Sequence, residues 1–117
     1  MNTVLTVENL KAYGANVEEA LGRCFNNEAF YLRLVGMELA DRNFDRLRDA
    51  VAAGDARAAF EAAHALKGAT GNLSLTPIYN PISALTERLR GQSEIGDVAA
   101  LMDEINAQLD RAKQLAE

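Results

Sequence analysis

The chain has 117 residues, of which 49% are hydrophobic and 25% are charged, and its formal net charge is −5. This length suits one domain with a single core, and the apolar content is too high for a disordered chain. The acidic balance argues against nucleic-acid binding, which needs clustered Lys and Arg. A single cysteine, Cys24, excludes an internal disulfide and a cysteine-cluster metal site. We expect one monomeric domain over residues 1–117.

Cellular location is predicted from two absent patterns. No apolar run approaches the roughly 18 residues that would predict a transmembrane helix. The first ten residues lack the basic segment followed by an apolar segment that is typical of a signal peptide. We therefore expect a cytoplasmic protein with no membrane partner. Cys24 is expected to be a buried or half-buried small apolar residue rather than a reactive thiol.

The first half of the chain predicts helices, because strong helix formers dominate and no segment alternates as a half-buried strand does. Short helices are expected over 7–12 and 17–25, capped by Thr6 and Asn16, with Gly14 ending the first. A longer amphipathic segment follows over 28–53. Its apolar stripe consists of Phe30, Leu34, Met37, Phe44, Leu47 and Val51, with one skipped turn near Ala40. We expect one helix here, because neither proline nor glycine lies at Arg42-Asn43, where the alternative of two helices would place a break.

The second half predicts three more helices. Gly54 ends the long helix and Asp55 caps the next, over 56–73, whose buried stripe is Ala59, Ala62, Ala63, Leu66, Ala69, Thr70 and Leu73. A helix to about Arg90 begins at Thr76-Pro77, as N-cap and first residue, and Pro81 either kinks it or delays its start to Asn80. After a loop over 91–96, Asp97 caps a last helix that reaches Leu115. Four long amphipathic helices joined by short loops predict an all-α, antiparallel up-down-up-down four-helix bundle, with the short N-terminal helices at one end.

The most informative residues lie on the face of the 56–73 helix that points away from the core. His64, the one histidine of the chain, falls on this solvent side by helical periodicity. Its expected neighbours are Lys67 on the flank, Gly68 and Gly71 on the same face, and Ala65 and Glu61 at the border. Each mid-helix glycine costs roughly 0.5–1 kcal/mol relative to alanine. Small residues around an exposed imidazole therefore predict a docking surface, although Gly71 could instead allow close helix packing.

Phosphoryl transfer is the chemistry that this face suits best. A neutral ring nitrogen of His64 can attack a phosphoryl group, and Lys67 can offset the charge of the transferred group. The chain has no P-loop and no nucleotide-binding βαβ pattern, so it cannot draw phosphate from ATP alone. A partner must supply the phosphoryl group and the metal. The sequence offers no ligand set for a metal and no cofactor site of its own.

The stretch from Ala63 to Leu73 resembles the signature of histidine-containing phosphotransfer (HPt) domains of two-component phosphorelays. That signature is a histidine followed by lysine at +3 and glycine at +4, here His64, Lys67 and Gly68. The preceding long helix and its turn at Gly54-Asp55 are also similar. The resemblance covers roughly residues 26–90.

The resemblance implies that His64 accepts the phosphoryl group from a phosphorylated receiver domain and passes it to a response-regulator aspartate. It implies that Lys67 steadies the group and that Gly68 clears space for the receiver domains of response regulators or hybrid kinases. The chain would then be a phosphocarrier without kinase activity. This sequence departs from the family pattern at two places. Many members have glycine near the position of Ser74, and Pro77 and Pro81 crowd the start of the next helix.

Two other classes of function stay open on the residues themselves. The chain could be a non-catalytic helical interaction module in which His64 is incidental, or an enzyme in which His64 and Glu61 form an acid–base pair. Arg42 and Arg46 could lie beside His64 across the hairpin, or simply form a solvated face.

Overall fold

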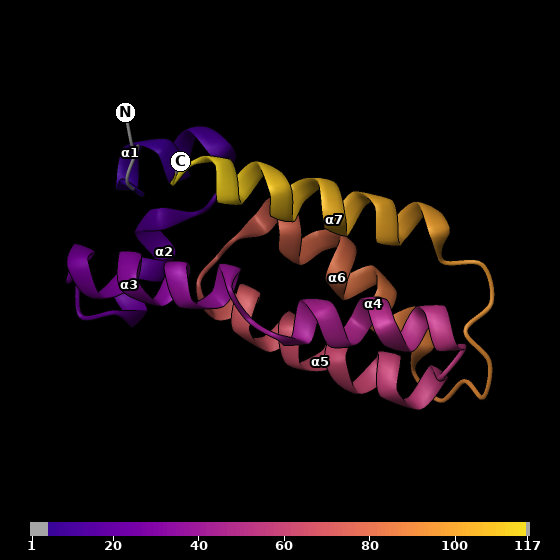
Figure 1. The fold of residues 1–117 in the computed structure, drawn as a ribbon. Helices are drawn as coiled ribbons and strands as arrows, with labels where there is room; N and C mark the ends of the chain where they lie inside the picture. The colour runs from indigo at the N-terminus through magenta and orange to yellow at the C-terminus, as the bar shows by residue number, and fades with distance from the viewer. Residues whose placement is uncertain (1–4, 117) are drawn as a thin grey trace.

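The structure is a computed structural model that describes residues 5–116. Within these residues the chain forms seven helices and no strand (Figure 1): α1 (Val7–Tyr13), α2 (Val17–Arg23), α3 (Glu28–Leu39), α4 (Asn43–Ala53), α5 (Ala56–Asn72), α6 (Thr76–Leu89) and α7 (Ala99–Gln114). The predicted all-α class is confirmed. Residues 1–4 and 117 of the expected domain lie outside the described residues.

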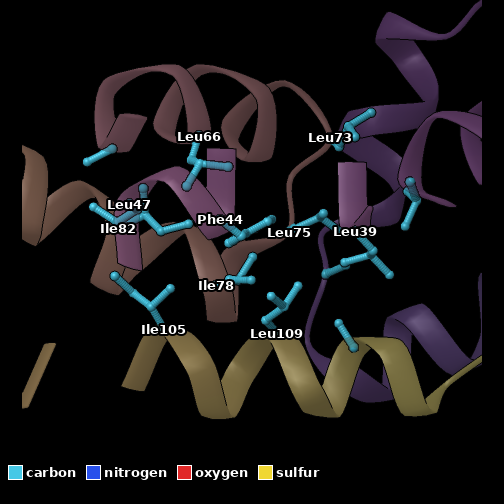
Figure 2. Close-up of a cluster of buried hydrophobic side chains, with 14 of the residues drawn as sticks. Leu39, Phe44, Leu47, Leu66, Leu73, Leu75, Ile78, Ile82, Ile105 and Leu109 are labelled. Atoms are coloured by element: carbon cyan, nitrogen blue, oxygen red, sulfur yellow. The ribbon is translucent and has the colours of Figure 1, made fainter. Parts of the chain in front are cut away.

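Helices α4 to α7 form the antiparallel four-helix bundle. Consecutive helices pack side by side, and Arg48 on α4 donates from Nη1 to Asn106 Oδ1 on α7 at 3.1 Å, which closes the bundle. Inward-facing leucine and isoleucine side chains from all four helices meet in one core (Figure 2), among them Leu47, Leu66, Ile82 and Ile105, which are at most 1% exposed. The turn between α4 and α5 is tight because Gly54 adopts φ +72°, a left-handed conformation that glycine tolerates best.

The short N-terminal helices cover one end of the bundle, as expected (Figure 1). The predicted N-caps both form, since Thr6 accepts from the Asn9 N–H and Asn16 accepts from the Glu19 N–H. Buried tyrosines fasten α1 and α3 to the bundle. The hydroxyl of Tyr13 donates to the Gln108 carbonyl at 3.1 Å, and that of Tyr31 donates to the Leu73 carbonyl at 3.0 Å.

The prediction of one helix over 28–53 is wrong, because the segment breaks between α3 and α4 at residues 40–42. The Asp41 side chain accepts a hydrogen bond from the Asn43 N–H at 2.8 Å, and the Asp41 carbonyl accepts from the Phe44 N–H at 3.2 Å. An aspartate that bonds nearby backbone N–H groups competes with helix continuation. A short polar side chain therefore makes the break without proline or glycine.

The break also changes which face of α3 is buried. Phe44 and Leu47 of the predicted stripe are buried on α4, whereas Phe30 and Met37 on α3 are 40% and 61% exposed. The core side of α3 is formed by Tyr31 and Val35, which are both fully buried. One stripe drawn through both helices fails because the non-helical residues at 40–42 reset the rotation of α3 relative to α4.

The remaining boundaries differ from the predictions by one or two residues. Helix α2 ends at Arg23 rather than at residue 25, because Phe25 and Asn26 both adopt left-handed backbone conformations. Helix α6 begins at Thr76 with Leu75 as N-cap and continues through Pro81, so Asn80 is not its start. Helix α7 begins at Ala99, and Asp97 accepts from the Ala99 N–H at 3.2 Å. Cys24 is buried, as expected. No helix in the described part of the chain is long and apolar enough to cross a membrane.

Candidate functional site

Helix α5 presents the candidate site from a well-anchored position. Asp55 caps it by accepting from the Ala58 N–H at 3.0 Å, as its sequence position predicts. Its core face is mostly alanine, with Ala59, Ala62 and Ala63 at most 5% exposed. Such small side chains allow α4 and α6 to approach α5 closely on both sides. Ala69 is half-buried rather than buried, while the rest of the predicted stripe is in the core.

His64 lies on the exposed side of α5, where helical periodicity places it. Its imidazole stacks on the ring of Phe60 one turn earlier, with 5.6 Å between ring centroids and 25° between ring planes. Phe60 is half-buried and packs against the core. The stack therefore gives an exposed imidazole a firm support on one side while the ring stays open to solvent.

Two cations meet one carboxylate beside this stack. Lys67 Nζ lies 2.9 Å from Glu87 Oε1, and Arg90 Nε lies 3.0 Å from Glu87 Oε2. The Arg90 guanidinium also lies 5.1 Å from the centre of the Phe60 ring, within the range of a cation–π contact. Hydrogen bonds from Arg90 and Lys67 lower the pKa of Glu87 to about 2, so this carboxylate stays ionised at neutral pH.

Three of these neighbours, Phe60, Glu87 and Arg90, were not predicted from the sequence. Phe60 was predictable, since an aromatic residue four positions before His64 lies on the same side of a helix. Glu87 and Arg90 were not, because they come from α6, and their place beside Lys67 depends on how α5 and α6 cross. Lys67 itself is where the sequence placed it, on the flank of His64, with a side chain 26% exposed.

The small residues around His64 have different surroundings. Gly68 is exposed, and a Cβ atom built there would have no heavy atom within 4 Å, apart from its chain neighbours and its own helix backbone. Ala65 is exposed as well. Gly71 is half-buried, and a Cβ atom there would lie 3.1 Å from Cε2 of Tyr79. The close approach of the Tyr79 ring favours helix packing at Gly71, the alternative that the sequence left open.

The end of α5 is held by a polar network from α2. Arg23 Nη1 donates to the Asn72 carbonyl and to Ser74 Oγ, both at 3.0 Å, and Arg23 also pairs with Glu19 at 2.9 Å. Ser74 adopts φ +52° and donates to Glu19 Oε1 at 2.8 Å. The turn at Ser74 is therefore left-handed although it holds no glycine, and the serine hydroxyl ties it to α2.

The other flank of His64, which faces α4, carries a different set of charged residues from Lys67, Glu87 and Arg90. Glu61 is paired with Arg57 at 3.3 Å, and both side chains are largely exposed. Arg46 and Glu61 line a hollow between α4 and α5 together with Asp49 and Ala62. Arg42 is exposed at the residue before α4. Arg90 is thus the cation that contacts the Phe60 ring, and Lys67 is linked to Arg90 through Glu87.

The arrangement can present an imidazole to a large partner and supply positive charge beside it. Lys67, Gly68 and Gly71 line an open hollow of about 430 Å³ rather than an enclosed cleft, which does not favour small-molecule catalysis by His64 and Glu61. Among the described residues there is no group of three or more His, Cys, Asp or Glu side chains placed to hold a metal ion.

Comparison with known families gives one match. The family model described as Hpt domain matches residues 35–115, which include α4 to α7 and the whole of the candidate site. No curated protein and no solved structure matches the chain.

Proposed function

Because the chain belongs to the Hpt domain family, whose members carry phosphoryl groups in two-component signalling, we propose that it is a phosphorelay intermediate that acts through His64. In this proposal a phosphorylated receiver domain delivers the group to His64, which passes it to an aspartate of a response regulator. The protein works as one cytoplasmic, monomeric domain over residues 1–117, and it is a phosphocarrier rather than a kinase.

One observation carries the proposal: the exposed imidazole of His64 rests on Phe60 beside Lys67 and Arg90. A transferred phosphoryl group bears negative charge on its equatorial oxygens, which cations beside the acceptor stabilise. Lys67 and Arg90 are both hydrogen-bonded to Glu87 in the unphosphorylated protein. We infer that the phosphoryl group on His64 competes with Glu87 for these two cations.

The transfer step needs little from the carrier besides position and charge. The unprotonated ring nitrogen of His64 attacks the phosphorus atom of an aspartyl phosphate. A nitrogen–phosphorus bond forms as the oxygen–phosphorus bond breaks, and the aspartate leaves as a free carboxylate. The onward step is the same exchange in reverse, onto the aspartate of the next receiver. Any metal requirement belongs to the receiver domain.

The docking surface of the proposal is the exposed part of α5 around His64. Gly68 and Ala65 are exposed small residues, so another backbone can approach the imidazole closely there. Gly71, the third predicted docking residue, is half-covered by Tyr79. An acidic protein that docks through this small neutral surface is not expected to bind nucleic acid.

The test is phosphotransfer from a receiver domain carrying radiolabelled phosphate. The parent protein should gain acid-labile, alkali-stable label, and His64→Gln should gain none while keeping its helical circular dichroism and melting temperature. Label that persists on His64→Gln would overturn the assignment of His64. A parent protein that binds the receiver but never gains label would instead favour the plain interaction module.

A further inference from the structure

A second feature of α5 lies beside the docking surface, where α3 packs against it. A hollow of about 350 Å³ is lined by Leu34, Met37 and Glu38 of α3, Asp41 of the break, Ala69 of α5, and Leu73, the C-cap of α5. We call it the α3–α5 hollow. Pockets for small organic groups measure roughly 300–1,000 Å³, so a long side chain fits this space. Ala69 directly follows Gly68, which places the hollow next to the proposed docking surface.

Glu38 is the unusual member of this lining. The residue is only 7% exposed, and its Oε2 atom has no hydrogen-bond partner. A buried carboxyl oxygen without a partner is costly, because desolvation is not offset by a bond. Burial raises the pKa of Glu38 to about 9, and a hydrogen bond with Asp41 and the negative charge of Asp41 add to this effect. Asp41 is the other titratable group of the lining, since α5 and its C-cap contribute only Ala69 and Leu73.

The lining of the hollow combines apolar and acidic residues. Leu34, Met37 and Leu73 are the apolar residues of the lining, and Glu38 and Asp41 are its acidic residues. Glu38 also lies in the last turn of α3, which contains no basic residue. The C-terminal end of a helix carries partial negative charge, so the backbone adds to the attraction for a cation. A side chain with an aliphatic stem and a cationic head matches all of these features.

We propose that the α3–α5 hollow binds an arginine side chain of the receiver domain that docks on α5, with Glu38 and Asp41 accepting hydrogen bonds from the guanidinium. Arginine suits two adjacent carboxyl groups because its planar donors can bond both at once. The identity of the partner rests on the proposed function, whereas the preference for arginine rests on the hollow itself.

Binding is coupled to loss of a proton. In the free protein the Glu38 carboxyl is protonated at neutral pH, and an adjacent guanidinium favours the ionised form. Each bound arginine therefore releases up to one proton. Affinity should rise with pH by up to about tenfold per unit while Glu38 is protonated in the free protein and ionised in the complex.

The test uses the full chain labelled with ¹⁵N and two tripeptides, acetyl-Gly-Arg-Gly-amide and its citrulline counterpart, which is neutral but similar in shape. The arginine peptide should shift the amide signals of Met37, Glu38 and Ala69 to saturation, more tightly at pH 8 than at pH 6. Glu38→Gln should weaken this binding about tenfold or more and remove its pH dependence. Glu28→Gln removes an exposed carboxylate from the first turn of α3 and should bind as the parent does.

Equal binding of the two peptides, or unchanged arginine binding by Glu38→Gln, would overturn the proposal. Because the peptides carry no phosphate, this result is independent of the test of His64. Phosphotransfer to His64 without arginine binding would reject the hollow alone. Arginine binding without phosphotransfer would reject the proposed function, and with it the receiver as the source of the arginine.

Discussion

Lys67 Nζ donates to Glu87 Oε1 at 2.9 Å, so the lysine of the His-x-x-Lys-Gly motif is already paired in this structure. The same carboxylate holds Arg90. Glu87 therefore keeps two cations beside His64 and at the same time neutralises part of their charge. The proposed competition between this carboxylate and a phosphoryl group predicts opposite effects for two substitutions.

Lys67→Ala should lower, and Glu87→Gln should raise, the share of label on His64 at equilibrium with a phosphorylated receiver. An exposed ion pair contributes little net free energy, so we expect changes of about two- to fivefold in each direction and little change in melting temperature. Quantitative phosphotransfer at equilibrium measures both. Glu61→Gln is the matched control, because Glu61 pairs with Arg57 on the opposite flank. If Glu87→Gln behaves like Glu61→Gln, Glu87 does not compete with the phosphoryl group.

Glu87 also predicts a dependence of stability on acid pH. Its pKa is lowered from 4.5 to about 2 by hydrogen bonds from Arg90 and Lys67. A lowered pKa in the folded state means that the stabilisation is present above pH 4.5 and is lost as the pH falls toward 2. Urea denaturation between pH 6 and pH 2 should show a shallower loss of stability for Glu87→Gln than for the parent. Parallel curves would mean that the carboxylate is solvated rather than bound.

The buried Glu38 carboxyl predicts the opposite pH dependence of stability, at neutral and alkaline pH. Its pKa is raised from 4.5 to about 9, so the folded protein holds a proton that the unfolded chain releases. Stability should then fall as the pH rises from 4.5 toward 9, by up to about 1.4 kcal/mol per pH unit. Glu38→Gln keeps the neutral shape and should be more stable than the parent at pH 8, by roughly 1–3 kcal/mol, but not at pH 4. A parent protein whose stability is flat over this range would show that Glu38 ionises freely.

Much of the site could be predicted because it depends on one helix. The cap at Asp55, the alanine face and the exposure of His64 all follow from the periodicity of a single continuous helix. Glu87 and Arg90 could not be predicted, because they reach the site from α6 and their position depends on how two helices cross. The fold prediction failed at Asp41 for a related reason. A short polar side chain that bonds nearby backbone groups is compatible with a helix in the sequence, and only its local hydrogen bonds show that the helix ends there.

The two glycines of the His64 face should respond differently to the same substitution. Gly68→Ala should stabilise the protein by up to about 1 kcal/mol, since a Cβ atom there meets open space and alanine is the better helix former. Gly71→Ala should gain less or lose stability, because its Cβ atom would lie 3.1 Å from the Tyr79 ring. Thermal melts of the two variants measure this difference directly. A stabilising Gly71→Ala of the same size would show that the Tyr79 ring moves aside without cost.

Substitutions at Gly68 should distinguish effects on folding from effects on receiver docking. Gly68→Gln should fold, because the site is exposed, yet its long side chain lies one turn from His64 on the same face and should obstruct a receiver. Transfer from one labelled receiver should therefore slow by about tenfold or more in Gly68→Gln, on the scale of losing one or two kcal/mol of docking energy. Stability and transfer would then respond in opposite ways to changes at Gly68. Transfer at the parental rate in a folded Gly68→Gln would place the docking surface elsewhere on the protein.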